Sequence, residues 1–178
     1  MSDQIVQVER IDGVLKLTLN DPKTRNALGP KMGQVLLSEL DKFEQNSEDR
    51  VLLLTGQDPS FCSGANIRRF SDDIKDNLAE ESRQPSDSDL PWGRMEAVLR
   101  KRKETDAMSV SVLPLRIHQL QKPTIAAVNG HAIGVGLGLA LACDIRLSSE
   151  DAVFSEAFVR MGLVPGDGSC WQLPKLIG

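Results

Sequence analysis

Two short loops rich in small residues contain the residue types best suited to binding a negatively charged oxygen. Residues 61–67 (FCSGANI) follow an apolar run, and residues 134–138 (GVGLG) open a small-residue helix just after a buried strand and a turn. N–H groups in the first turn of a helix have no partner within it and favour negative charge. One amide from each loop would form an oxyanion hole. Alternatively, the glycines serve only tight backbone packing.

The glycine-rich residues 134–138 do not match a nucleotide-binding motif. They lack the third-glycine spacing of Gly-x-Gly-x-x-Gly, and no Gly-Lys-Ser or Gly-Lys-Thr follows. The net charge of −4 gives no general attraction to nucleic acid or to anionic lipid. We interpret the basic residues 100–103 as a solvated helix face rather than a nucleic-acid or phosphate patch. Neither nucleic acid nor a membrane is therefore expected as a partner.

Length and composition indicate one folded domain, residues 1–178, in a reducing compartment. The chain is 40% hydrophobic and 26% charged, the balance of an ordinary folded domain. Its widely spaced cysteines, Cys62, Cys143 and Cys170, suit free thiols, and no Cys-x-x-Cys or His cluster offers a metal site. The N-terminal residues lack the basic and apolar regions of a secretory signal, so we expect a cytoplasmic protein.

Hydrophobic patterning predicts an α/β fold that would position these loops. The apolar run 51–55 indicates a strand buried on both faces, and so a sheet covered by helices. The uncharged residues 123–143 are interpreted as strand, turn and helix rather than as a membrane span. The expected elements are a hairpin (5–8 and 14–19, around Asp12-Gly13), helices (30–43, 113–120, 133–142 and 169–177) and strands (51–55, 124–128, 143–147 and 152–154).

Five ordered segments of the sequence have the character of family motifs. They are 21–28 (DPKTRNAL), 61–67 (FCSGANI), 122–132 (KPTIAAVNGHA), 143–145 (CDI) and 162–166 (GLVPG). Together they resemble the successive motifs of the enoyl-CoA hydratase/isomerase (crotonase) superfamily. The resemblance implies ββα units wound as a spiral, assembly as homotrimers or dimers of trimers, and acyl-CoA thioester substrates of fatty-acid metabolism. It implies no cofactor beyond the coenzyme A that the substrate itself carries.

The same resemblance assigns roles to residues in the two loops. The N–H groups of Ala65 and Val135 would hold the thioester oxygen as its enolate forms. The segment that contains Arg25 and Ala27 would border the phosphates of coenzyme A, with Arg25 as their charge partner. Alternatively, Arg25 is an exposed loop arginine with no particular role. Backbone carbonyls that would contact the adenine belong to Ser63, Ala65 and Ile67.

Departures from the family pattern bear on the reaction. The two glutamates with which hydratases of the family handle water are replaced by Gly138 and Phe158, which cannot move a proton. Where some isomerases of the family have a catalytic Asp, this sequence has Gly166, and Asp167 follows it directly. Asp167 and Glu156 are the candidate bases for an α- or γ-proton. Alternatively, Asp167 caps a turn and Glu156 sits at a helix N-terminus.

The expected activity is therefore that of an enoyl-CoA hydratase/isomerase family lyase or isomerase, either isomerase-like or an atypical hydratase. A non-catalytic acyl-CoA-binding or assembly protein of the same fold is the alternative. Two further departures concern length. The resemblance implies a C-terminal helical part that this sequence does not include, either because it is a fragment or because the remainder is not ordered. Residues 70–112 form an unusually long segment, which we interpret as a lid or insertion over the acyl pocket.

Overall fold

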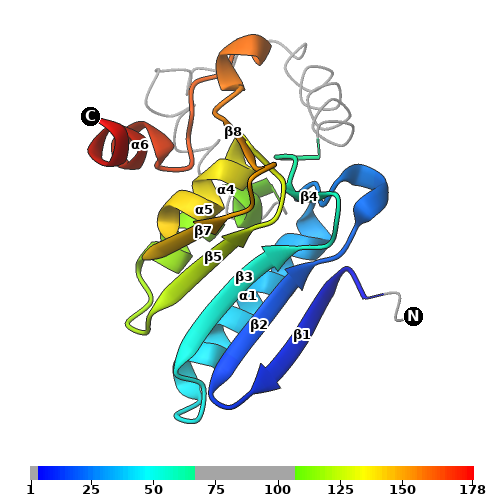
Figure 1. Ribbon diagram of the computed structural model, residues 1–178, viewed down its shortest axis with the longest axis vertical. Helices are drawn as coiled ribbons and strands as arrows, with labels where there is room; N and C mark the ends of the chain where they lie inside the picture. Colours follow the sequence, from blue (N-terminus) through cyan, green and yellow to red (C-terminus); the bar gives the residue numbers. More distant parts are fainter. Residues whose placement is uncertain (1–3, 67–106) are drawn as a thin grey trace, which may run out of the picture.

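The computed structural model describes residues 4–66 and 107–178, and this part of the chain follows four successive strand–strand–helix units (Figure 1). Two short 3-10 helices, η1 (Pro22–Thr24) and η2 (Phe158–Met161), lie in the first and last units. The units comprise β1 (Val6–Ile11), β2 (Val14–Leu19) and α1 (Pro30–Gln45); β3 (Val51–Gly56), β4 (Ser60–Cys62) and α4 (Ala107–His118); β5 (Thr124–Val128), β6 (His131–Ile133) and α5 (Val135–Ala142); β7 (Ile145–Ser148), β8 (Val153–Ser155) and α6 (Ser169–Ile177).

The strands form two sheets. The larger has the order β1-β2-β3-β5-β7, and only its β1–β2 pair is antiparallel. That pair is closed by Asp12 and Gly13, whose φ angles of 51° and 84° match the positive values that a two-residue hairpin turn requires. The smaller sheet is parallel, with the order β4-β6-β8. From the second unit onward, each first strand joins the larger sheet and each second strand the smaller, so the chain advances as the expected spiral.

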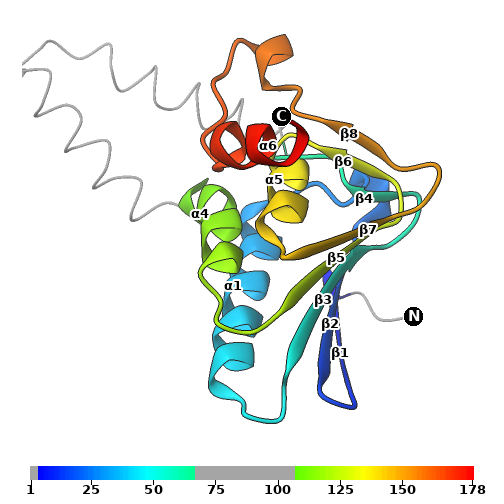
Figure 2. The ribbon, with the colours of Figure 1, turned by 60° about the vertical axis from the view of Figure 1, so that its left-hand side comes forward.

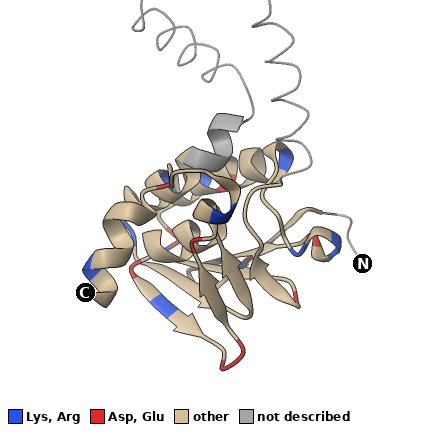
Figure 3. Ribbon diagram, turned by 90° about the horizontal axis from the view of Figure 1, so that it is seen from above, with Lys and Arg blue, Asp and Glu red and all other residues tan. Residues whose placement is uncertain are grey.

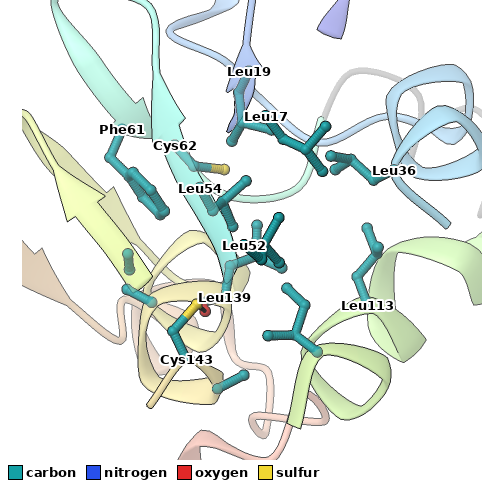
Figure 4. Packing of buried hydrophobic residues seen from close by; sticks show 14 of the residues in the cluster. Leu17, Leu19, Leu36, Leu52, Leu54, Phe61, Cys62, Leu113, Leu139 and Cys143 are labelled. Atoms are coloured by element: carbon teal, nitrogen blue, oxygen red, sulfur yellow. Dashed lines mark hydrogen bonds between the residues drawn. The ribbon is translucent and has the colours of Figure 1, made fainter. Parts of the chain in front are cut away.

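The core lies between the larger sheet and the helices α1, α4 and α5, which are all on one side of it (Figure 2). Leu52 and Leu54 of β3 are at most 1% exposed and lie with Leu113 of α4 and Leu139 of α5 (Figure 4). The alternate residues of β3, such as Leu53, are only half-buried. The prediction that this strand is buried on both faces is therefore wrong, because these helices pack on a single face.

Most of the expected elements are confirmed, including the hairpin, the helix from Pro30 and the helix over Ser169–Ile177. The helix predicted over residues 133–142 begins at Val135 instead. Ile133 pairs with Ser155 in the smaller sheet, and Gly134 turns the chain with φ 53° and ψ −125°. Strands β4 and β6 were not predicted, because three residues are too few to show an alternating pattern.

Residues 123–143 form β5, β6 and α5 in the structure, as the sequence predicts. Within the described residues, no helix is both long and apolar enough to cross a membrane. Basic and acidic residues are dispersed among these elements (Figure 3). The segment 70–112 lies mostly outside the described residues, and its last part, from Ala107, begins α4. Its interpretation as a lid stays a prediction.

Candidate active site

The loop that follows β4 lies against the connection between β2 and α1. The Ser63 N–H donates a hydrogen bond to the Arg25 carbonyl oxygen at 3.0 Å, and the Ser63 hydroxyl donates to the Thr24 carbonyl oxygen at 2.9 Å. Arg25 is exposed and has a φ of 57° at the end of η1. Its guanidinium makes no ion pair with the described residues, so its charge faces solvent beside the loop.

The same two segments continue side by side beyond Ser63. The Leu28 N–H donates to the Gly64 carbonyl oxygen at 2.8 Å, and Leu28 and Ala65 form an isolated parallel bridge. Ala27 is half-buried beside this bridge. The structure thus brings together four of the five residues expected at coenzyme A, and the fifth, Ile67, lies outside the described residues.

Asn26 holds this arrangement in place, a role that we did not predict from the sequence. Its side chain is fully buried, and the Asn26 amide NH₂ donates to the carbonyl oxygens of Gln57 and Ser60 at 2.7 and 2.6 Å. Its amide oxygen accepts from the Asp21 N–H at 2.9 Å. Buried polar groups need such partners, so Asn26 ties the connection after β2 to the β3–β4 turn.

The N–H groups of Ala65 and Val135 have no acceptor within the described part of the chain. At Ala65, the neighbouring Gly64 carbonyl and Asn66 N–H bond to Leu28, so the Ala65 N–H points away from that partner, as ladder geometry requires. Val135 is the first residue of α5, where a helical N–H has no partner within the helix. Both amides are therefore free to donate to a ligand.

Close backbone contacts bring the two loops together. A Cβ atom added at Gly136 would lie 2.4 Å from the Cys62 carbonyl oxygen, so only glycine lets α5 approach β4 this closely. A Cβ atom added at Gly64 would lie 3.0 Å from the Ile133 carbonyl oxygen. Ala65 and Val135 are each adjacent in sequence to one of these contact residues. The same glycines can therefore allow tight packing while the neighbouring Ala65 and Val135 amides stay available to a ligand.

Glu156 follows β8 and lies beside the start of α5. The Gly134 N–H donates to the Ser155 carbonyl oxygen at 2.7 Å. A Cβ atom added at Gly134 would lie 3.7 Å from both the Glu156 carbonyl oxygen and the Phe158 ring. The chain around Glu156 therefore passes directly next to the residue that precedes the free Val135 amide.

Asp167 occupies the space that a side chain at position 138 would fill. A Cβ atom added at Gly138 would lie 2.4 Å from Asp167 Oδ2 and 2.9 Å from its Cγ. Asp167 is 6% exposed, and its Oδ2 has no hydrogen-bond partner among the described residues. The space that a side chain at position 138 would fill is thus occupied by a carboxylate from another segment. Gly138 lies about one helical turn along α5 from Val135.

The hydroxyl of Ser169 contacts both candidate bases. Ser169 Oγ lies 2.8 Å from Glu156 Oε2 and 2.6 Å from Asp167 Oδ1. The Ser169 N–H also donates to Asp167 Oδ1 at 3.1 Å. Both carboxyl groups therefore belong to one cluster. We did not predict Ser169 from the sequence, because its role depends on Glu156, 13 residues away, which only the fold brings near it.

The environment of Glu156 disfavours its ionised form. Burial raises the pKa of Glu156 above its ordinary value, and the negative charge of Asp167 raises it further, while the hydrogen bond from Ser169 acts in the opposite direction. A carboxyl group with a raised pKa is suited to proton transfer.

The comparison with known families decides which kind of protein contains this cluster. Residues 14–178 match the family model described as Enoyl-CoA hydratase/isomerase. The chain belongs to this family. The crotonase-like fold class expected from the five motifs is thereby confirmed.

Individual family members agree with this assignment. A protein from Rhodobacter capsulatus named "Probable enoyl-CoA hydratase" is 34% identical over all of this chain and 59% of its own length. The 1,2-epoxyphenylacetyl-CoA isomerase of Escherichia coli is 33% identical over 93% of this chain and 55% of its own. The crystal structure of an enoyl-CoA hydratase from Polaromonas sp. JS666 superposes with a TM-score of 0.76 at 29% identity, covering 97% of this chain and 59% of that one. The chain thus spans between half and two thirds of the length of these relatives.

Two further motif residues of this enoyl-CoA hydratase/isomerase family member have structural roles. The Asp144 carboxylate accepts from the Thr124 N–H and hydroxyl, both at 2.8 Å, and so joins the beginnings of β5 and β7. Burial raises the pKa of the Cys62 thiol to about 12, which keeps it protonated and unreactive. Within residues 4–66 and 107–178, no three His, Cys, Asp or Glu side chains gather closely enough to hold a metal ion.

The contact between Gly138 and Asp167 leads to a first prediction. We expect Gly138→Ala to lower the free energy of unfolding by about 1–3 kcal/mol, because the new methyl group must displace the buried carboxylate. In an Asp167→Ala background, the nearest remaining atom is the Cβ at 3.4 Å, so the same change is tolerated. It then gains up to about 1 kcal/mol of helix propensity. Urea unfolding of the four proteins measures this coupling, and additive effects would contradict the contact.

Proposed function

We propose that this protein is an acyl-CoA-processing enzyme that stabilises a thioester enolate and moves a proton with the Glu156–Asp167 pair. The observation that carries the proposal is the position of this pair. Two carboxyl groups joined by Ser169 lie beside the start of α5, where the Val135 amide has no partner among the described residues. The free Ala65 amide, on the loop packed against α5, supplies the second donor.

The proposed chemistry uses each group for one task. The Ala65 and Val135 N–H groups donate to the thioester oxygen and strengthen these bonds as the oxygen gains charge, which is typically worth about 3–4 kcal/mol of transition-state stabilisation per donor. A carboxylate removes a proton from the carbon next to the thioester or from the γ-carbon. A carboxyl group returns a proton at the other end of the enolate, which shifts the double bond.

An isomerase-like reaction suits these residues better than the usual hydration. Gly138 and Phe158 stand where hydratases of the family place their glutamates, and the Asp167 carboxylate fills the space at Gly138. The carboxyl group near position 138 thus belongs to a different backbone position from the glutamate of those hydratases. We therefore expect it to approach the substrate from a different direction. An atypical hydratase would have to position water from Asp167 and Glu156 instead.

A non-catalytic acyl-CoA-binding or assembly protein is the second candidate. It is favoured by the absence of carboxyl groups at positions 138 and 158. Turnover of crotonyl-CoA and of a 3-enoyl-CoA, measured beside a binding titration with a non-reacting acyl-CoA thioester, distinguishes the three functions. Isomerisation with little hydration supports the main proposal, hydration alone supports the atypical hydratase, and binding without turnover supports the second candidate.

Coenzyme A recognition by the exposed Arg25 gives a second prediction. We expect Arg25→Ala to weaken binding of an acyl-CoA by about tenfold or more, since a charge-assisted contact to phosphate is lost. Binding of the same acyl group on pantetheine, which lacks the nucleotide phosphates, should change little. Isothermal titration with both ligands measures the difference. Lys23→Ala is the matched control, because Lys23 is an exposed base two residues away, and equal losses for both ligands would remove Arg25 from the site.

We also propose that the protein acts in the cytoplasm and assembles as a homotrimer or a dimer of trimers. Apolar side chains that are widely exposed along η2, the loop after it and α6 support an assembly, because isolated domains seldom expose so many together. A sedimentation experiment that finds only monomers at every concentration would contradict it. The most exposed of them are Val159, Val164 and Ile177, at 85%, 85% and 73%.

A further inference from the structure

The Ser169 hydroxyl faces more acceptors than it can satisfy with its own hydrogen. Its Oγ lies within hydrogen-bond distance of Glu156 Oε2 and Asp167 Oδ1, at 2.8 and 2.6 Å. A serine has a single O–H hydrogen, whereas an ionised carboxylate is an acceptor only. If both carboxylates were ionised, one of the two contacts would join two oxygen atoms with no hydrogen between them. A proton on one of the carboxyl groups would supply the missing hydrogen.

The surroundings indicate which group that is. Asp167 Oδ1 also accepts from the Ser169 N–H at 3.1 Å, so this oxygen faces a backbone donor as well as the hydroxyl. Glu156 has no such backbone donor among the described residues, and its Oε1 is buried without a partner there. Burial and the charge of Asp167 both disfavour an ionised Glu156.

Other ionisable groups on the elements around this pair do not compensate for the two negative charges. Helix α5 has no ionisable side chain between Val135 and Ala142. Among the described residues, the other ionisable side chains on neighbouring elements do not shift the pKa of Glu156. They are the buried thiol of Cys62 on β4 and the exposed side chains of His131 on β6, Arg160 on η2, and Cys170 and Lys175 on α6.

We propose that Ser169 is a positioning residue that keeps one proton on the Glu156–Asp167 pair, donating its O–H to ionised Asp167 and accepting the O–H of protonated Glu156. The inference rests on the proposed function, since it assigns the acid and the base of that site. Asp167 is then the group that removes a substrate proton, and Glu156 the group that holds one to return. A single carboxyl group could do only one of these tasks at a time.

The proton can be observed without any substrate, so this test is independent of the proposed function. Difference infrared spectroscopy detects the carbonyl band of a protonated carboxyl group. At a pH of about 6, an ordinary glutamate is almost fully ionised, whereas we expect the parent protein to keep such a band that Glu156→Gln removes. Loss of the band at the same pH as for ordinary carboxyl groups would overturn the proposal, even for an active enzyme.

Folding stability gives a second measurement with a definite sign. Because the pKa of Glu156 is raised in the folded state, the folded protein binds more protons than the unfolded chain between the ordinary glutamate pKa and that raised value. Stability therefore falls as the pH rises through this interval. We expect Glu156→Gln to remove this contribution to the dependence of folding stability on pH. An unchanged pH dependence in this variant would count against a retained proton.

Variants of Ser169 test the bridge itself. We expect Ser169→Ala to shift the Glu156 infrared band and to alter the pH–rate profile, because the hydroxyl that joins the two carboxyl groups is lost. The kcat should fall with KM unchanged, and Ser169→Thr should restore the profile. Ser60→Ala, which removes another buried hydroxyl away from the pair, is the control. If Ser169→Ala leaves both the band and the profile unchanged, Ser169 does not join the two groups.

Discussion

We expect Val135→Pro to lower acyl-CoA turnover by about 100- to 1,000-fold, the effect typical of losing one oxyanion donor. Proline removes the N–H and leaves the rest of the backbone in place. Val135 is the first residue of α5, a position that suits the fixed φ of proline. The preceding Gly134 has no Cβ to clash with the proline ring. Initial rates with a 3-enoyl-CoA, together with circular dichroism to confirm folding, provide the measurement.

The matched control for this change is Val135→Ala, which keeps the N–H. The Val135 side chain is 5% exposed and packs in the core, so alanine costs stability but should retain turnover within a few fold. If Val135→Pro fails to fold, replacing residue 135 by the corresponding hydroxy acid removes only the N–H. Turnover equal to that of the parent in either donor-free protein would show that the amide serves packing alone.

Asp167→Asn should have a comparable or larger effect. We expect turnover to fall by about 100- to 10,000-fold, the usual contribution of a general acid or base. Binding of a non-reacting acyl-CoA should change little, because an asparagine fits the same buried space beside Gly138. Its amide oxygen can still accept from the Ser169 N–H, as Asp167 Oδ1 does at 3.1 Å. Rates and a binding titration on the same preparation separate the two effects.

Asp151→Asn is the control for the change in charge, since Asp151 is exposed and in the turn before β8. It should leave turnover unchanged. If Asp167→Asn is as active as the parent while Glu156→Gln is inactive, the base is Glu156 and Asp167 only shapes its surroundings. If both variants are fully active, neither group moves the proton and the mechanism proposed for this site is wrong.

Much of the fold can be predicted from local sequence. The Asp12-Gly13 turn, the amphipathic pattern from Pro30 and the helix over Ser169–Ile177 all appear in the structure as expected, because turn chemistry and helical periodicity act over a few neighbouring residues. Burial was harder to predict. The apolar run of β3 does not reveal that only one face of the strand, which carries Leu52 and Leu54, packs against the helices (Figure 4).

Most residues of the candidate site could be predicted from the sequence, but the contacts between them could not. The sequence singled out the glycine-rich loops, Asp167 and Glu156 as separate features, with a structural alternative for each. It could not indicate that Ser169 would contact both carboxyl groups, or that Asn26 would hold the connection after β2 against the β3–β4 turn. Glu156 lies 13 residues from Ser169, and Gln57 lies 31 residues from Asn26, so no local pattern encodes these contacts.

The sequence by itself determined the family, the order of the ββα units and the absence of glutamates at positions 138 and 158. These properties depend on residue identity and on short-range spacing. Only the tertiary structure decided that the Asp167 carboxylate fills the space left by Gly138 and meets Glu156 at a single serine hydroxyl. The reason is physical: the protonation of a carboxyl group depends on its burial and on charges and hydrogen bonds a few ångströms away, and folding alone brings those groups together.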